Sequence, residues 1–143
     1  MLSKSAQYAL RSVICLAVNS DEDNKYSPKD IAEKIEIPVS YLATILKQLS
    51  KREIISSSKG RNGGFFLTKK NAQTPLIEVV ECIDGLQKIK SCVMGIPNCS
   101  DENPCPLHHL YLPLRNDILD ELRNKNIKEF AKGVIDGDTV LFE

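Results

Sequence analysis

The order of elements between residues 27 and 68 limits the fold of this chain more than any other feature. Ser27-Pro28-Lys29-Asp30 combines a capping serine, a proline at the first helical position and an acid at the capping-box position. A short helix is therefore predicted to start here and to bury the apolar residues within 31–35. Pro38 interrupts the pattern, because the residue before a proline is pushed out of helical geometry. Apolar residues at helical spacing from 42 to 49 then predict a second helix.

Two segments of strand composition follow directly, at residues 54–58 and 65–68. The sequence between them, Lys59-Gly60-Arg61-Asn62-Gly63-Gly64, is basic and rich in residues that accept a positive φ, so it predicts a β-hairpin. Two short helices separated by a tight turn and followed by such a hairpin are the outline of a winged helix-turn-helix.

Helical spacing continues on both sides of this unit. Residues 4–19 predict a first helix, and Thr74-Pro75 predicts the start of another that ends at Gly85. A long helix is expected from Pro106 to about residue 122, with a kink at Pro113, and a last short turn at 127–132. The apolar positions of the long helix are Leu107, Leu110 or Tyr111, Leu114, Ile118 and Leu122. Dimerisation would bury that face, and packing against the chain's own first helix is the alternative.

The predicted fold class is therefore mainly α with a small β-hairpin. We expect a winged helix-turn-helix DNA-binding domain over residues 1–71. Residues 72–143 are expected to hold a loop with three cysteines and a long C-terminal dimerisation helix.

Charge is divided unevenly between these two parts, although the formal net charge is zero. Residues 1–71 hold 12 basic and 7 acidic side chains, so the remaining residues, with 7 and 12, carry the opposite net charge. From Lys47 to Lys70 there are seven basic residues against a single Glu53. The asymmetry favours a polyanion-binding N-terminal part, and a solvated basic surface without a partner would give the same count.

The polar positions of the helix after Pro38 are the candidate nucleic-acid contacts. Small hydroxyls and amides read base edges, while lysines bind phosphates. Ser40, Tyr41 and Thr44 are expected to contact bases or nearby backbone, whereas Lys47, Gln48 and Lys51 are expected on phosphates or the groove flank. At the hairpin tip, Lys59 and Arg61 can enter the minor groove, whose negative potential attracts long cations.

Three cysteines follow with the spacing Cys92-x6-Cys99-x5-Cys105, in a loop that also carries glycine and prolines. Three thiolates this close in sequence can converge on one metal centre, and His108 or His109 can supply a fourth ligand. The spacing alone leaves an iron-sulfur cluster, a zinc ion and free thiols equally open, because no pair has the short spacing typical of zinc ribbons.

The remaining cysteines, Cys15 and Cys82, are interpreted as small buried hydrophobes. An odd count of five cysteines without an export signal argues against a disulfide framework, and no apolar run is long enough to span a bilayer. We therefore expect a cytoplasmic protein. No catalytic triad or paired carboxylates stand out, so an enzyme is not expected.

Several motifs together resemble the IscR and NsrR family of bacterial regulators, also called the Rrf2 family. They are Ser5-Ala6-Gln7-Tyr8-Ala9-Leu10-Arg11, Ile31-Ala32-Glu33, Pro38-Val39-Ser40-Tyr41-Leu42, Ser58-Lys59-Gly60-Arg61-Asn62-Gly63-Gly64-Phe65 and the three cysteines with His108. The resemblance covers nearly the whole chain. It implies a homodimer, a long dimerisation helix and an iron-sulfur cluster bound by the loop.

The resemblance also implies a ligand set. In IscR-like members a histidine just after the third cysteine is the fourth ligand of a 2Fe-2S centre, and His108 occupies that position. In some NsrR-like members an aspartate on the first helix of the other subunit completes a 4Fe-4S centre. The matching residue here is Gln7, a poor iron ligand, so 2Fe-2S is favoured. Ala43 and Thr44 replace a glutamate and a glutamine of IscR-like proteins, so a different operator is expected.

The function predicted is a sequence-specific transcriptional regulator that binds a partly palindromic operator in double-stranded DNA as a dimer. Its affinity would be set by a cluster that senses redox state, nitric oxide or cluster supply. The alternative within DNA binding is a zinc- or thiol-based regulator without iron. A cluster-carrying redox protein and a protein-interaction adaptor that works through the acidic C-terminal half are the rivals from other classes.

Overall fold

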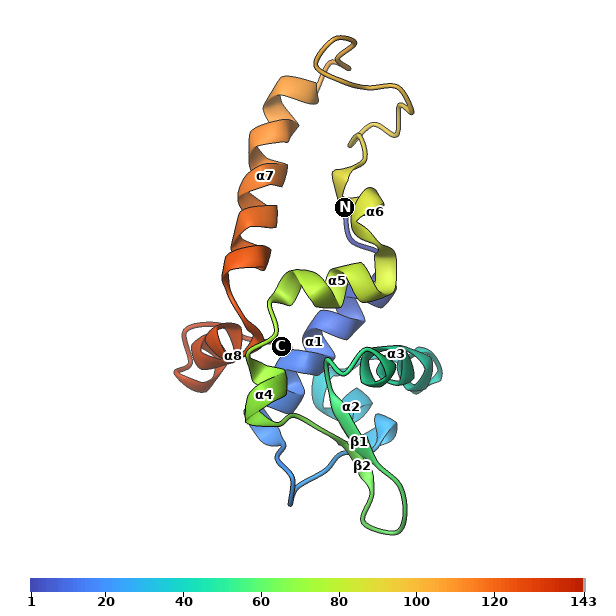
Figure 1. The fold of residues 1–143 in the computed structure, drawn as a ribbon, viewed down its shortest axis with the longest axis vertical. Coiled ribbons are helices and arrows are strands. Elements are labelled where there is room, and N and C mark those ends of the chain that lie inside the picture. The colour runs from blue at the N-terminus through green and yellow to red at the C-terminus, as the bar shows by residue number, and fades with distance from the viewer. Residues whose placement is uncertain (143) are drawn as a thin grey trace.

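Helix α1 (Lys4–Asn19) runs through the middle of the fold, and helices from both halves of the sequence pack around it (Figure 1). The computed structural model describes residues 1–142. The elements that follow are α2 (Pro28–Ile35), α3 (Val39–Lys51), β1 (Ser56–Ser58), β2 (Gly64–Phe66), α4 (Lys69–Ala72), α5 (Leu76–Asp84), α6 (Leu86–Lys90), α7 (His108–Asn124) and α8 (Ile127–Ile135). The predicted class, mainly α with a small hairpin, is confirmed.

The central position of α1 follows from its apolar stripe. Ala6, Ala9, Val13 and Leu16 recur at helical spacing and are fully buried. They face α2, α3, α5 and α8. Complete burial of a side chain such as Val13 or Leu16 contributes about 1.5–3 kcal/mol. Ser3 starts the helix, because its side chain accepts a hydrogen bond from the Ala6 backbone N–H.

The helix-turn-helix forms where the sequence predicts it. Ser27 and Asp30 make a reciprocal capping box at the start of α2, with Pro28 at the first helical position. Glu36 ends α2 in the left-handed conformation with φ 54°, and extended Pro38 precedes α3. The apolar face of α3 is buried as expected through Leu42, Ile45, Leu46 and Leu49.

The hairpin pairs β1 with β2 in antiparallel register, with Ser57 opposite Phe65. Tyr26 extends this pairing, since its backbone exchanges two hydrogen bonds with Phe65 at 2.9 and 2.8 Å. A Cβ atom at Gly63 would lie 2.3 Å from the Ser58 carbonyl oxygen, so this turn position requires glycine. The strands are shorter than the predicted segments, because Ile54 turns into the core before pairing begins.

Two short helices, α4 and α6, were not predicted, because four or five residues are too few to show a helical period. α8 is a nine-residue helix rather than the short turn expected. Asn126 and Glu129 form its capping box, and Ile127 and Ala131 are buried. Contacts with α1 and α4 therefore hold this last helix against the rest of the fold.

Helix α7 is buried only near its C-terminal end, where Leu119 and Leu122 enter the core. Further towards its start the side chains of Leu110, Leu114 and Ile118 are 68, 55 and 37% exposed. Pro113 lies inside the helix. The long helix expected from residue 106 is thus present, and its N-terminal apolar stripe is not covered by the described part of its own chain.

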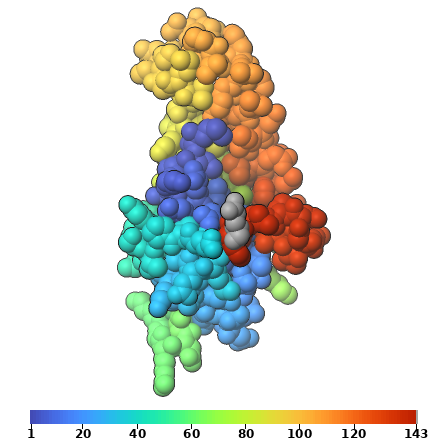
Figure 2. Space-filling view, turned by 180° about the vertical axis from the view of Figure 1, so that it is seen from behind, coloured from blue at the N-terminus to red at the C-terminus, as the bar shows by residue number. Residues whose placement is uncertain are grey.

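The loop of residues 91–107 joins α6 to α7 at one end of the long axis, and the hairpin protrudes at the other end (Figure 1). The space-filling view from behind shows the same separation (Figure 2). Among residues 1–142, no helix has both the length and the apolar content that a membrane crossing requires.

Candidate functional site

The loop of residues 91–107 is held closed at its base. Lys90 ends α6, and its carbonyl oxygen accepts a hydrogen bond of 2.6 Å from Nη1 of Arg115 on α7. Within the loop the Gly95 N–H donates to the Cys92 carbonyl and the Cys99 N–H to the Ile96 carbonyl. These local turns fold an irregular segment back over the first turns of α7.

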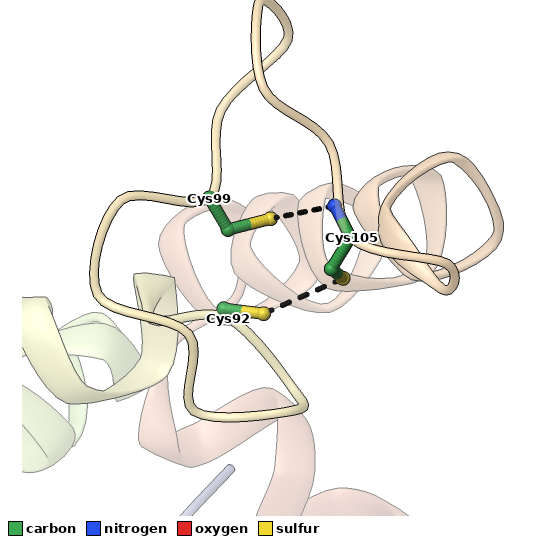
Figure 3. A group of neighbouring side chains, drawn as sticks. All are labelled: Cys92, Cys99 and Cys105. Atoms are coloured by element: carbon green, nitrogen blue, oxygen red, sulfur yellow. Dashed lines mark hydrogen bonds between the residues drawn. The ribbon is translucent and has the colours of Figure 1, made fainter.

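Cys92, Cys99 and Cys105 converge inside this loop (Figure 3). Their three Sγ atoms all lie within 4.8 Å of one another. Cys92 Sγ is 3.5 Å from Cys105 Sγ, and the Cys105 backbone N–H donates to Cys99 Sγ at 3.4 Å. Three thiol groups at this separation, in a segment that short turns keep folded, can share one centre.

His108 lies beside the thiols, at the first position of α7. Its Nδ1 is 3.2 Å from Cys99 Sγ, and its Nε2 is 2.8 Å from Oδ1 of Asp101. The hydrogen bond from His108 lowers the pKa of the Asp101 carboxyl. The neighbouring His109 is exposed and meets the His108 ring edge-on at 5.2 Å. Of the two candidate histidines, the structure thus brings His108 to the cysteines.

The thiols differ in acidity. The backbone N–H of Ile96 lowers the pKa of Cys92 to about 7, with further hydrogen bonds that include one from the Met94 N–H. The Cys105 N–H lowers the pKa of Cys99, but burial and the neighbouring thiols outweigh it and leave that pKa raised. Of these two thiols, Cys92 therefore loses its proton first, and thiolate ligation requires that loss.

The donor set fits a metal centre. Three soft thiolates and one imidazole nitrogen suit iron-sulfur clusters and zinc alike. The cavity among them measures about 40 Å³ and is also lined by Lys90 and Arg115. Nε of Arg115 is buried without a hydrogen-bond partner in residues 1–142. An unpaired cationic donor of this kind beside three thiols suits a site for a group of negative charge.

The other predicted positions lie away from this loop. Cys15 is buried on α1, and burial raises its pKa. Cys82 was expected to be buried, but it is partly exposed and packs at the edge of the core. α5 turns this residue towards α3, where its Sγ lies 3.6 Å from the Gln48 carbonyl oxygen. Gln7 donates a hydrogen bond to the Leu2 carbonyl at 3.2 Å.

All the predicted nucleic-acid contacts are exposed. They are Ser40, Tyr41, Thr44, Lys47, Gln48 and Lys51 on α3 and Lys59 and Arg61 in the hairpin turn. A groove of about 440 Å³ between α3 and β1 is lined by Lys47, Lys51 and Lys59. These three ammonium groups make the groove electropositive, which suits a phosphate backbone.

A second groove lies on the other side of α3 and measures about 410 Å³. Ser40, Tyr41, Thr44 and Gln48 line it together with Ser3 and Asp84.

The sequence did not indicate that the start of α1 and the end of α5 would border the exposed face of α3. It also did not single out Asp101 or Arg115, because an acid in a loop and a cation on a helix carry no signal by themselves.

The comparisons with known proteins agree with this arrangement. The profile of the Rrf2 family, described as an iron-dependent transcriptional regulator, matches residues 2–133. A predicted HTH-type transcriptional regulator of Aquifex aeolicus is 32% identical over 90% of each chain. The HTH-type transcriptional regulator IscR of Cronobacter sakazakii is 28% identical over 91% of this chain and 79% of its own. The structure of T. potens IscR has a TM-score of 0.70 at 17% identity, covering 98% of this chain and 92% of its own.

These matches confirm the resemblance that the sequence motifs indicated, and they extend over nearly the full length of the chain. A family of transcriptional regulators also accounts for the lack of an enzymatic signature in the sequence. The chain belongs to the Rrf2 family of DNA-binding transcriptional regulators.

Proposed function

We propose that this protein is a homodimeric regulator whose affinity for a specific operator depends on an iron-sulfur cluster bound by Cys92, Cys99, Cys105 and His108. The observation that carries the proposal is the convergence of the three Sγ atoms within 4.8 Å, with Nδ1 of His108 only 3.2 Å from Cys99 Sγ. The matching family is described as iron-dependent, which favours iron over zinc.

The residues have separate tasks in holding the cluster. The cysteines supply thiolates and His108 supplies a neutral nitrogen, a set that favours a 2Fe-2S centre. Arg115 lines the same cavity, and its guanidinium would balance part of the thiolate charge. When bound, an iron-sulfur cluster supplies a redox centre that oxidants or nitric oxide can alter. A bound cluster would link the three cysteines and so restrain the loop, and loss of the cluster would remove that restraint.

The DNA would be read by two elements. The exposed face of α3 fits a major groove, with Ser40, Tyr41 and Thr44 at the bases and Lys47, Gln48 and Lys51 nearer the phosphates. The hairpin then reaches an adjacent minor groove with Lys59 and Arg61. The groove between α3 and β1 supports this division, since its lysines face the space where the backbone would pass.

The exposed stripe of α7 supports the dimer. Leu110, Leu114 and Ile118 recur every four residues and form a continuous apolar row on one helix. A second copy of the same helix would bury this row and would set the distance between two α3 helices, as a partly palindromic operator requires. The cysteine loop precedes the same helix, so its conformation can bias that distance.

The division at residue 71 stays a proposal about function, with DNA contacts before it and the loop and dimer contacts after it. The hydrophobic core is shared across it, because Val79 and Ile127 belong to the same buried cluster as Val13 and Leu46. A change in the second part can therefore reach the first through packed side chains.

A zinc- or thiol-based regulator is the second candidate, because the same donors would bind zinc and because Cys92 has a pKa of about 7. Anaerobic purification with measurement of iron, sulfide, zinc and the absorption spectrum separates the two. Iron-thiolate charge transfer absorbs at roughly 400–500 nm, where zinc and thiols are colourless. Iron and sulfide in equal amounts are expected.

Single alanine variants complete the test. Alanine at position 92, 99 or 105 is expected to abolish cluster binding while the helical content survives, because the loop contributes little to the core. The matched controls are Cys15→Ala and Cys82→Ala, which remove a thiol away from the loop and should retain iron. Colour that persists in all three loop variants would overturn the cluster assignment.

A further inference from the structure

A tight turn at residues 100–103 places Asp101 next to His108. Ser100 and Asn103 exchange two backbone hydrogen bonds at 3.2 and 3.1 Å, and the Asn103 N–H also reaches the Ser100 hydroxyl at 3.2 Å. The Asn103 side chain donates to the Asn98 carbonyl at 3.4 Å. The turn thus fixes the backbone from which the Asp101 carboxylate meets the imidazole.

The two ring nitrogens of His108 face different partners. Nε2 lies 2.8 Å from an Asp101 oxygen, and Nδ1 lies 3.2 Å from Cys99 Sγ. An ionised carboxylate only accepts hydrogen bonds, so Nε2 must carry the proton. In the neutral ring this leaves the lone pair on Nδ1, directed at the thiols.

The opposite ring orientation would remove both interactions. Turning the imidazole by half a revolution would put carbon atoms where Nδ1 and Nε2 now lie, opposite Cys99 and Asp101. The His108 side chain is 12% exposed, so a misplaced ring could not exchange these partners for water.

We propose that Asp101 is a positioning residue that makes Nδ1 the ligand atom of His108 and retains the ring in place. This inference rests on the proposed function, because it concerns the same centre. Groups that hydrogen-bond the free N–H of a metal-bound histidine fix its tautomer and raise its basicity. Asp101 would do so from a position 81% exposed, where an ion pair contributes little to folding. Its effect is therefore expected in cluster properties and not in the stability of the fold.

The ligand atom can be tested by selective isotope labelling. Protein loaded with its cluster is prepared with histidine labelled with ¹⁵N only at Nδ1, and separately only at Nε2. The reduced centre is then studied by pulsed EPR. A His109→Gln background leaves His108 as the one histidine, since the sequence has two. A strong hyperfine coupling is expected from the Nδ1 label.

The role of Asp101 is tested with Asp101→Asn, and the matched control is Glu102→Gln. Both remove one negative charge from neighbouring exposed positions of the same turn, but Asp101 is the one bonded to His108. Asp101→Asn is expected to speed cluster loss to a chelator about tenfold, the lower end of the effect of such groups. It should also raise the reduction potential, because the imidazole donates less electron density. Glu102→Gln should change the rate of cluster loss and the reduction potential much less. Asp101→Glu should bring both partly back to the wild-type values.

The outcomes separate this inference from the proposed function. A strong coupling from the Nε2 label, or equal effects of the Asp101→Asn and Glu102→Gln variants, overturns the role of Asp101 while the cluster stands. Iron and sulfide without any coupled histidine nitrogen overturns the role of Asp101 and removes His108 from the ligand set, while the cluster on the three cysteines stands. Wild-type protein that takes up no iron after anaerobic reconstitution overturns both.

Discussion

Asp84 accepts a hydrogen bond of 3.0 Å from the backbone N–H of Ser3, and its other carboxylate oxygen accepts one from the Ser3 hydroxyl. The last residue of α5 is thereby attached to the residue that caps α1. From Asp84 the chain continues through α6 to Cys92, and both Ser3 and Asp84 line the groove beside α3. This pair of hydrogen bonds joins the loop side of the molecule to the side that carries the exposed face of α3.

Replacement of Asp84 by Asn should weaken that connection. Hydrogen bonds to a charged group contribute about 1.5–3 kcal/mol, and we expect a loss of stability near the lower value because the pair is only partly buried. The difference in operator affinity between cluster-loaded and cluster-free protein should also shrink. Urea unfolding and DNA titrations measure the two effects. Glu81→Gln, an exposed acid of the same helix, is the control and should change neither.

Replacement of Lys59 and Arg61 by Ala should weaken binding to every DNA sequence. Each cation that no longer neutralises a phosphate leaves a counterion on the DNA, so the slope of log affinity against log salt should fall by about 0.9 per cation. Binding measured across salt concentrations tests this. Lys128→Ala removes an exposed cation from α8 and should leave the slope unchanged. An unaltered slope in the double variant would remove the hairpin from the interface.

Substitutions at Tyr41 and Thr44 should change which operator is preferred more than they change non-specific affinity. Base contacts carry sequence information, whereas phosphate contacts do not. Selection from a randomised operator library, compared with binding to unrelated DNA, measures both. Lys47→Ala serves as the contrast, because it should weaken binding to all sequences to a similar degree. A uniform decrease for Tyr41 and Thr44 variants would assign these residues to positioning.

In the cluster-free protein Cys92 should be alkylated before Cys15 and Cys82. The thiolate is the nucleophile, and hydrogen bonding lowers the pKa of Cys92 to about 7, so its rate should rise towards a plateau as the pH passes through that value. Burial raises the pKa of Cys15 and of Cys82, which should react only at higher pH. Iodoacetamide labelling followed by peptide mass spectrometry gives each rate. Faster labelling of Cys82 at pH 7 would contradict this order.

Replacement of Asn71 by Ala should destabilise the hairpin side of the fold. The side-chain Oδ1 of Asn71 accepts from the Ser56 hydroxyl at 2.8 Å and from the Thr68 N–H at 2.9 Å, while its side-chain Nδ2 donates to the Glu53 carbonyl at 2.9 Å. Breaking this buried set leaves unpaired groups, at a cost of about 1–3 kcal/mol. Chemical denaturation measures it. Asn62→Ala, in the exposed hairpin turn, should cost much less.

The sequence by itself determined the helix-turn-helix and its hairpin, because interactions between near neighbours in the chain specify them. The capping box of Ser27 and Asp30, the break at Pro38 and the glycine-rich turn act through dihedral preferences and through hydrogen bonds between near neighbours. The apolar period of α3 also fixes which residues stay exposed, whatever the helix packs against. These features needed no knowledge of the rest of the chain, and the structure confirms the helix-turn-helix and its hairpin.

Only the tertiary structure decided the arrangement of the second half. The loop of residues 91–107 has no period, so long-range contacts such as the one from Arg115 to the Lys90 carbonyl determine where its thiols lie. The sequence favoured His108 over His109 through its spacing from Cys105 and through the resemblance, but it could not show that the ring meets the thiols, because that contact forms only when the loop packs on α7. For the same reason it could not place Asp101. The sequence named the candidate donors, and their convergence depends on packing between segments far apart in the chain.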